Sequence, residues 1–340
     1  MAQEGLAAPT VVLAGSVQSS RRTLQGLLRH GVNVAGVLGL APESARFVPG
    51  YARMDDLCAA AGIRHAEFTD INSPECMAFV RELAPDLLFV VGLAQLVRRP
   101  LLSMPRLGSI GFHPAWLPEG RGRSPISWLI LEGRPGAATF FLIDDGVDSG
   151  PILAQEPFPI TDRDYTSDVL DKLEAAIDKA LDRWIPRLLA GKWEPMPQIR
   201  EDATFTGRQS PSDAVIDWEL PAEGIQARIR AHSRPYSGAY TYYRDRKLVV
   251  WEAEVDNASD YRGVVGRVIQ TRQGKGPLVQ CGSGLLCLTE TEIQPGLGEE
   301  GRPGQDIAVG ARLGYNTENE IFKLKQRIAQ LERIVKQSGE

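Results

Sequence analysis

The feature that most constrains the fold is a near-continuous apolar run, DLLFVVGL, at Asp86–Leu93. A strand of this composition needs cover on both faces, which a parallel sheet between two layers of helices provides. Similar short apolar runs occur at Thr10–Gly15, Val32–Gly39, Gly108–Phe112 and Ala137–Ile143. Because helical patterns separate several of these runs, the sequence predicts an α/β fold with a doubly wound, mostly parallel sheet.

The spacing of apolar residues predicts the helices that cover this sheet. Three leucines within Leu24–Leu28 share one helical face, and further helices are expected at Met54–Ala61 and Ser73–Leu83. A long helix with one continuous apolar stripe is expected over Tyr165–Leu189.

The pattern changes after residue 200. Short alternating runs separated by Gly, Asp and Lys turns fill the stretch from Thr206 to Arg312, which favours a small β-rich, barrel-like domain. We therefore expect a main α/β domain at residues 1–200, a barrel-like domain at 206–313 and a C-terminal helix at 315–340.

The expected C-terminal helix carries apolar residues at alternating steps of three and four. They are Ile321, Leu324, Ile328, Leu331 and Val335. This is the heptad spacing of a coiled coil, extended over two to three heptads. Two interpretations stay open: the helix docks on its own domain, or it pairs with a second copy in a homodimer.

Composition narrows the class of protein. The formal net charge of −5 leaves no overall electrostatic footprint for nucleic acid, so a nucleic-acid partner is not expected. The chain shows no secretory signal and no apolar run long enough to span a membrane. Its four cysteines form no CxxC pair and lack zinc spacing, which predicts reduced thiols, no metal and a cytoplasmic protein.

A lone histidine, His113, stands where one of the buried strands should end. Ligands of open α/β sheets bind beyond the carboxyl ends of strands, and the acidic turn Asp144–Gly150 follows another strand. A histidine exchanges protons near neutral pH, and a nearby carboxylate can orient its ring. Pro114 and Pro118 stiffen the loop behind it. Taken singly, the histidine could instead cap a strand and the aspartates form a turn.

Two motifs together resemble the 10-formyltetrahydrofolate-dependent formyltransferase family. They are HPAWLPEGRGRSPI, from His113, and TFFLIDDGVDSGPILAQ, from Thr139. The family includes methionyl-tRNA formyltransferase and the nucleotide-sugar and other small-amine N-formyltransferases. The resemblance extends to DLLFVVGLAQLV, which looks like the family's folate strand and loop, and to the start of the β-rich domain. It implies a Rossmann-like catalytic domain, 10-formyltetrahydrofolate as formyl donor, and no metal.

The resemblance also implies catalytic positions. His113 and Asp148 match the family's histidine and aspartate, whereas the family's asparagine position is Gly111. Loss of one oxyanion donor costs roughly 3–4 kcal/mol of transition-state stabilisation. Gln95 or Ser124 could replace that donor. A restored asparagine could instead clash, because Pro114 and Trp116 already make the neighbouring loop bulky, and we expect the clash.

Binding residues follow from the same resemblance. Those expected to line the folate site are Phe89, Val91, Gly92, Leu93, Gln95, Leu96, Asp144, Asp145, Gly146 and Val147. Those expected to contact the acceptor are Pro114, Arg121, Gly122, Arg123 and Ser124. The guanidinium groups of Arg121 and Arg123 match the geometry of a phosphate.

The acceptor is expected to be the amine of a small molecule, with an amino sugar of a nucleotide-sugar as the leading candidate. Residues 40–63, where methionyl-tRNA formyltransferase carries a basic insertion, hold two arginines against one glutamate and two aspartates. That balance cannot form a strong phosphate clamp. The alternatives are methionyl-tRNA as acceptor, or a folate-binding protein whose catalysis is impaired by Gly111.

Overall fold

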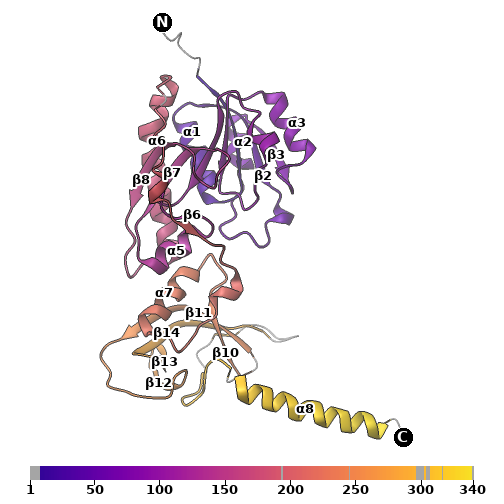
Figure 1. Cartoon of the computed structure of the whole chain (residues 1–340), viewed down its shortest axis with the longest axis vertical. Helices are drawn as coiled ribbons and strands as arrows, with labels where there is room; N and C mark the ends of the chain where they lie inside the picture. The colour runs from indigo at the N-terminus through magenta and orange to yellow at the C-terminus, as the bar shows by residue number, and fades with distance from the viewer. Residues whose placement is uncertain are drawn as a thin grey trace. The chain divides into compact units, whose positions relative to one another are not determined.

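The computed structural model describes residues 8–192, 194–244, 246–295, 302–303, 307–315 and 317–338. The chain divides into two compact units (Figure 1). The first comprises the residues up to Ser210 with Arg230–Ser237, and the second comprises Pro211–Ile229 with the residues from Gly238 onward. The domain limits expected from the sequence stay a prediction, because compactness does not show which segment folds by itself. Residues 316, 339 and 340 of the predicted tail helix lie outside the described residues.

The sheet of the first unit has the predicted α/β character. Its strands are β1 (Thr10–Gly15), β2 (Asn33–Leu40), β3 (Arg64–Phe68), β4 (Leu87–Val91), β5 (Gly108–His113), β7 (Gly136–Leu142) and β8 (Ile152–Phe158). Their order is β3-β2-β1-β4-β5-β7-β8, and β1 to β5 pair in parallel. The mostly parallel, doubly wound fold is therefore confirmed. Its strand order reverses between β1 and β4, the point where open α/β sheets bind ligands.

Helices cover the sheet as the apolar spacing predicts. They are α1 (Gln18–Arg29), α2 (Asp55–Ala61), α3 (Pro74–Leu83), α4 (Arg99–Leu102), α5 (Pro125–Glu132) and α6 (Thr166–Leu189), with the 3-10 turns η1 (Pro42–Ser44) and η2 (Arg200–Asp202) in connections. The stripe of α6 is buried, and its Trp184 ring lies 5.9 Å from Phe140 and 6.0 Å from Phe89 between ring centroids. This aromatic cluster fixes β4 and β7 against the long helix.

One inference from the sequence needs correction. We expected His113 and the acidic turn to meet because both follow strands that run in the same direction. In the structure β7 is antiparallel to β5, so that Ile110 pairs with Leu142 and His113 pairs with Thr139. The carboxyl ends of β5 and β7 therefore lie at opposite edges. Only nine residues join β7 to β8, too few for a parallel crossover, and this connection brings Asp148 to the histidine.

The second unit is an antiparallel sheet with two helices. Its elements are η3 (Pro211–Ala214), α7 (Ala222–His232, whose last turn belongs to the first unit), β10 (Ala239–Tyr243), β11 (Arg246–Asp256), β12 (Val268–Arg272), β13 (Gly276–Gln280), β14 (Leu285–Ile293), β15 (Arg302–Pro303) and α8 (Thr317–Ser338). The strand order is β10-β11-β14-β13-β12, with β15 beside β14. Bridges from Arg312 to Arg267 and from Leu313 to Tyr243 link the two edges, in keeping with the predicted barrel-like domain.

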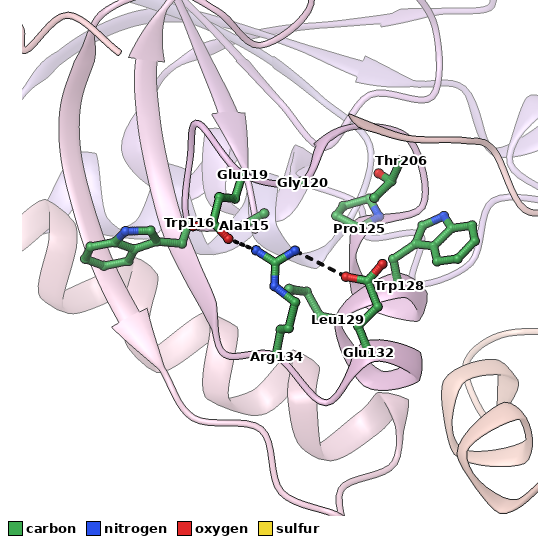
Figure 2. Close-up of a pocket in the computed structure, with 10 residues that line it drawn as sticks. All are labelled: Ala115, Trp116, Glu119, Gly120, Pro125, Trp128, Leu129, Glu132, Arg134 and Thr206. Carbon is green, nitrogen blue, oxygen red and sulfur yellow. Dashed lines mark hydrogen bonds and ion pairs between the residues drawn. The ribbon is translucent and has the colours of Figure 1, made fainter. Parts of the chain in front are cut away.

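The loop after β5 is tied to α5 by ionic contacts in the first unit. Arg134 pairs with Glu119 in that loop and, at 3.2 Å, with Glu132 at the end of α5 (Figure 2). Trp116 and Trp128 border the same region, around a cavity of about 10 Å³. A cavity of that size holds about one water molecule and is too small for a substrate.

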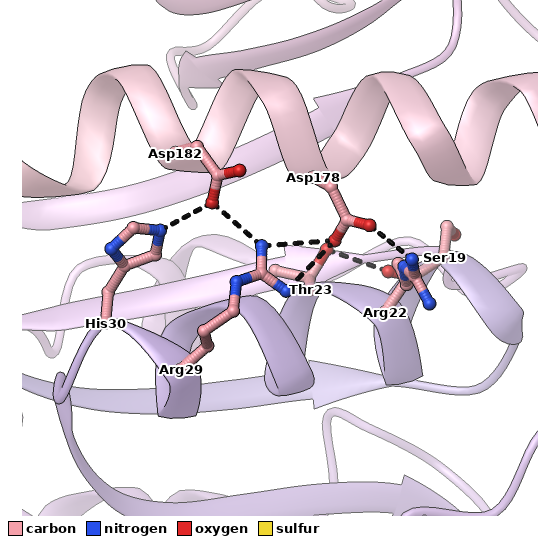
Figure 3. Close-up of polar contacts among 7 residues, drawn as sticks. All are labelled: Ser19, Arg22, Thr23, Arg29, His30, Asp178 and Asp182. Atoms are coloured by element: carbon pink, nitrogen blue, oxygen red, sulfur yellow. Dashed lines mark hydrogen bonds and ion pairs between the residues drawn. The ribbon is translucent and has the colours of Figure 1, made fainter.

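A second ionic network joins α1 to α6 (Figure 3). Asp178 pairs with Arg22 and, at 3.3 Å, with Arg29. Asp182 lies 2.9 Å from the Arg29 guanidinium and 2.7 Å from His30 Nε2. Its hydrogen bond with Arg29, followed by the one with His30, holds the pKa of Asp182 below its ordinary value. The network therefore supports the helix pair when this carboxyl is ionised.

We predict that Asp182→Asn lowers the free energy of unfolding by less than about 1 kcal/mol at pH 7, because the carboxylate is half exposed and screened. A depressed pKa stabilises the fold above the ordinary value near 3.9 and loses that effect as pH falls through the folded value. The difference from the parent in urea unfolding should therefore shrink below about pH 4. Asp171→Asn is the control, an exposed α6 carboxylate with no hydrogen bond or ion pair among the described residues. A difference that grows in acid contradicts the assignment.

Candidate active site

His113 is the last residue of β5, and only 5% of it is exposed. Its Nε2 lies 2.8 Å from the carbonyl oxygen of Gly120, and its Nδ1 lies 3.6 Å from Asp148 Oδ2. A carbonyl oxygen can only accept, so the nitrogen in the first contact carries a proton. Nδ1, which faces the carboxylate, is therefore the nitrogen that can gain or lose one.

The loop that supplies the Gly120 carbonyl is held by side chains from other elements. Thr139 Oγ1 donates to the carbonyl of Ala115 at 2.7 Å, and Gln155 Nε2 donates to that of Leu117 at 3.1 Å. The Gly120 amide donates to Thr204 Oγ1 at 2.8 Å. These bonds fix the ring orientation of the histidine through its carbonyl partner.

Asp148 is fixed just as firmly. Its backbone has a left-handed φ of 47°, a conformation that side-chain-bearing residues seldom adopt and that is often found at functional sites. Oδ2 accepts from the Gly122 amide at 2.9 Å, and the Asp148 carbonyl accepts from Gln198 Nε2 at 2.8 Å. Gly122 has a φ of 113°, and a Cβ there would lie 2.4 Å from the Thr206 carbonyl oxygen. Only glycine fits this position.

The space beside Gly111 is already filled. A Cβ on this glycine would lie 2.6 Å from Phe141 Cζ and 3.1 Å from Ile143 Cγ1. The Phe141 ring is buried in a small cluster with Leu117 and Ile152. The neighbours that resist a larger residue at position 111 are therefore Phe141 and Ile143, rather than the Pro114 and Trp116 that the sequence suggested.

The two side chains considered as replacement donors bond elsewhere. Gln95 Nε2 donates to the carbonyl of Thr69 at 2.6 Å, and Gln95 Oε1 accepts from the amide of Ile71 at 2.9 Å. Ser124 Oγ accepts from the Gln209 amide at 3.0 Å, which leaves the hydroxyl its own proton to donate. Gln95 therefore holds the residues after β3, whereas Ser124 keeps donor capacity.

The residues expected to line a folate site fall into two groups. Phe89 and Val91 are fully buried in the core, so they can support such a site only through the strand they form. The others are half-buried or exposed: Gly92, Leu93, Gln95, Leu96, Asp144, Asp145, Gly146 and Val147. Arg99 at the start of α4 lies 3.2 Å from Asp145, which links the two loops that carry them. Leu96 and Val147 leave 86% and 58% of their surface exposed there.

The residues expected to contact the acceptor also fall into two groups, one buried and one exposed or half-buried. The Arg121 guanidinium is buried, bonds Gln198 Oε1 at 2.7 Å and lies 5.9 Å from the centroid of the Phe205 ring. Arg121 and Gly122 form strand β6 (Arg121–Gly122), which pairs with β9 (Phe205–Thr206). Arg123 is exposed, and its guanidinium has no hydrogen bond or ion pair among the described residues. Pro114 and Ser124 are half-buried.

Several residues that build the site escaped the sequence analysis. Thr139 offered a weak signal, as the polar residue within an apolar run. Gln198, Thr204 and Thr206 offered none, because they lie in an irregular segment about 50 to 60 residues after Asp148. Ser16 Oγ, which donates to the carbonyl of Gly92 at 2.7 Å, lies at the reversal of strand order.

Other chemistry finds little support in the described residues. No group of three or more His, Cys, Asp or Glu side chains there is arranged to hold a metal ion. The four cysteines are free and buried, and burial raises the pKa of the Cys58 thiol to about 11, where it is a poor nucleophile at neutral pH. None of the described helices combines the length and apolar character needed to cross a membrane.

Comparison with known families identifies the class. Residues 11–187 match the family described as formyl transferase, and residues 208–300 match its C-terminal domain. The chain therefore belongs to the formyl transferase family, as the two sequence motifs suggested, and is an enzyme of that class. The methionyl-tRNA formyltransferase of Chloroflexus aggregans is 32% identical over 290 residues, covering 84% of this chain and 92% of that protein. The corresponding protein of Chloroflexus aurantiacus is 33% identical over 291 residues, with the same shares covered.

Solved structures share the fold at low identity. HypX from Aquifex aeolicus in complex with tetrahydrofolic acid superposes with a TM-score of 0.60 at 14% identity, over 85% of this chain and 45% of that chain. The N-formyltransferase from Helicobacter canadensis in complex with folinic acid and dTDP-3-aminofucose gives a TM-score of 0.60 at 14% identity, over 84% and 99%. At this identity the likeness establishes the fold.

We predict that Gly111→Asn lowers kcat for formyl transfer, because the new side chain must displace the buried Phe141 ring and thereby disturb β5 two residues before His113. Overpacking of this kind costs roughly 1–3 kcal/mol of stability, visible as a lower melting temperature. In the Phe141→Ala background, which removes the clash, the same asparagine should lower the melting temperature less than it does in the parent. Phe141→Ala alone is the control. A Gly111→Asn variant faster than the parent contradicts this account, and shows that the glycine merely lacks a donor.

Proposed function

We propose that this enzyme transfers a formyl group from 10-formyltetrahydrofolate to the amine of a small molecule, with the amino sugar of a nucleotide-sugar as the leading acceptor. The observation that carries the proposal is the buried His113, with one ring nitrogen bonded to a backbone carbonyl and the other facing Asp148. A histidine so oriented can move one proton, at Nδ1, in an acyl transfer.

The predicted folate surface suits a flat heterocycle. Leu96 and Val147 expose apolar side chains on two loops that Arg99 and Asp145 link. Exposed apolar groups beside irregular backbone can cover a ring while main-chain groups bond its edge. When bound, the folate supplies a formyl carbon attached to nitrogen.

The residues of this chain then manage charge and protons. Transfer joins the acceptor nitrogen to the formyl carbon, breaks the bond from that carbon to the folate nitrogen, and moves one proton from the amine to the folate nitrogen. His113 can carry that proton at Nδ1 and, when protonated, stabilise the negative oxygen that develops. The Asp148 carboxylate, 3.6 Å away, attracts positive charge on the ring.

We predict that His113→Ala abolishes most formyl transfer, with a loss of about 10²- to 10⁴-fold in kcat. Asp148→Asn should cost nearly as much, because asparagine tolerates the left-handed backbone and removes only the charge. The double variant should be little worse than either single variant, since the two residues act as one unit. The measurement is tetrahydrofolate release from 10-formyltetrahydrofolate in the presence of candidate amines. Unchanged transfer by His113→Ala overturns the mechanism.

The proposal of a small acceptor rests on the charges after β2. Arg53 is bonded to Asp55 at 2.7 Å and lies 3.8 Å from Glu67, and Asp56 is bonded to Arg21 at 2.5 Å. These contacts raise the pKa of Arg53 through its bond to Asp55 and leave little positive charge for a phosphate backbone.

Arg123 is the residue best placed to read a phosphate on the acceptor. It is exposed two residues beyond the buried Arg121, in the segment that positions Asp148. We predict that Arg123→Gln raises KM for a phosphate-bearing amine about tenfold or more, with kcat little changed, because charge-assisted bonds to phosphate contribute about 1.5–3 kcal/mol. KM for the folate donor is the internal control.

Arg121→Gln is the matched variant. It should instead lower stability and kcat, because Arg121 supports Gln198 and through it Asp148. Equal KM effects in the two variants contradict the assignment of Arg123.

A second candidate acceptor is methionyl-tRNA, favoured by the curated relatives at 32–33% identity. If formylation of methionyl-tRNA falls steeply as salt is added, as counterion release requires, this acceptor is favoured over the small amine.

A third candidate is a folate-binding protein without transfer, suggested by Gly111. Calorimetry that shows micromolar binding of 5-formyltetrahydrofolate, with no turnover of any amine, distinguishes that case.

We further propose that the enzyme acts in the cytoplasm and as a homodimer held by α8. Support for the first is the presence of four free, unpaired cysteines. Support for the second is the exposed apolar stripe of α8.

A further inference from the structure

The stripe on α8 is not buried against its own domain. Ile321, Leu324, Ile328, Leu331 and Val335 expose between 47% and 70% of their surface. Single exposed apolar residues are ordinary, but a contiguous row along one helix indicates a partner surface. The apolar stripe of this helix therefore does not dock on its own domain.

Another side of the first turns of the helix borders a cavity of the second unit. Asn319, Glu320 and Lys323 line a cavity of about 500 Å³ together with Tyr243 and Arg312 of the second unit. In the heptad that starts at Ile321 these three occupy positions f, g and c. The a and d positions therefore face away from the cavity and stay available.

The residue types at a and d select one kind of partner. Position a holds Ile321, Ile328 and Val335, and position d holds Leu324 and Leu331. β-branched residues at a with leucine at d favour two parallel strands over three or four. A second copy of the same helix supplies the matching set of residues in the same register.

Charged residues beside the apolar stripe determine whether two α8 helices pair in parallel or antiparallel. In a parallel pair, each g residue faces the e residue of the next heptad on the partner helix. Glu320 then faces Lys325 of the second copy, and Arg327 faces Glu332 of the second copy. Both pairs attract. The bond of Glu320 to Lys323 within one helix is exposed and contributes little, so it does not prevent the exchange.

The antiparallel alternative in which the two stripes overlap over residues 321–331 repels at the same positions and leaves Val335 opposite Thr317. If Leu324 packs against Ile328 of the second copy and the reverse, g faces g and e faces e. Arg327 then meets Arg327, and Lys325 meets Lys325. Shifting the pair by one heptad relieves the repulsion but removes Ile321 from the apolar overlap. Only the parallel, in-register pair keeps every apolar layer and attracts along both flanks.

We propose that α8 joins two copies of this enzyme through a parallel, in-register, two-stranded coiled coil over residues 320–335. The proposal deepens the homodimer proposed above and rests on it. The His113 site of each copy is complete in one chain, so the pairing and the formyl transfer can fail independently.

The first test measures mass by sedimentation equilibrium on the full chain. The parent should show twice the 37.2 kDa of one chain. Ile328→Glu places two carboxylates face to face in the central layer and should weaken dimerisation by about 100-fold or more, since like charges brought together cost several kcal/mol. Gln326→Glu adds the same charge at the outward position f and should leave the dimer intact. Tetrahydrofolate release should persist in both variants. A monomeric parent overturns the proposal.

The second test determines whether the two α8 helices run parallel or antiparallel. Arg327→Glu and Glu332→Arg each create a like-charge contact and should weaken a parallel dimer, whereas the double variant restores the attraction. In the antiparallel pair Arg327 already faces Arg327, so Arg327→Glu exchanges one like-charge contact for another and neither single variant should weaken the dimer. Val335→Cys should form a disulfide between copies on mild oxidation, because a-position residues of a parallel pair are adjacent. In the antiparallel pair these residues lie about 27 Å apart along the axis. The native cysteines are buried and do not compete. A dimer that resists this cross-link overturns the parallel arrangement.

Discussion

The hydrogen bond between His113 and the carbonyl of Gly120 is the constraint on which the site depends. It assigns the proton on Nε2, leaves Nδ1 for chemistry, and turns that nitrogen toward Asp148. The carbonyl keeps its place because Thr204 and Gln155 hold the loop from two distant parts of the chain. A single protonation site in a family enzyme is thus specified by backbone geometry, and the histidine could not be exchanged for a more flexible group without losing that direction.

Much of the fold could be predicted because its signals are local. The apolar run at β4 required cover on both faces, and the stripe of α6 supplies part of it through Trp184. The direction of β7 could not be predicted in the same way. Its run of residues suits either direction relative to β5, and the short connection that follows shows only that β8 turns back along β7. The inference that His113 meets Asp148 was therefore right for the wrong geometric reason.

The residues of the site also fall into those that the sequence could predict and those that it could not. His113 and Asp148 belong to recognisable sequence motifs, so their proximity could be inferred from the sequence. The residues that hold them do not, since Gln198 and Thr204 bond backbone groups of segments about 50 to 80 residues away. Side-chain-to-backbone bonds leave little trace in residue type, because many polar residues can make them. Burial was equally hidden: Arg121 and Arg123 look equivalent in sequence, yet one is packed against Gln198 and the other is exposed.

Gly111 is best understood together with Phe141. The ring lies in the volume that a side chain at position 111 would need, and with Leu117 and Ile152 it makes an apolar wall beside this glycine. Such a wall offers no hydrogen-bond donor, and an apolar surface holds water less well than an amide side chain would. Electrostatic interactions strengthen as the local dielectric falls, so in the proposed mechanism a drier site favours the action of the protonated ring on a developing negative oxygen. The Phe141 ring packed on Gly111 provides apolar surface in place of a side chain at position 111, so the size of either residue limits the size of the other.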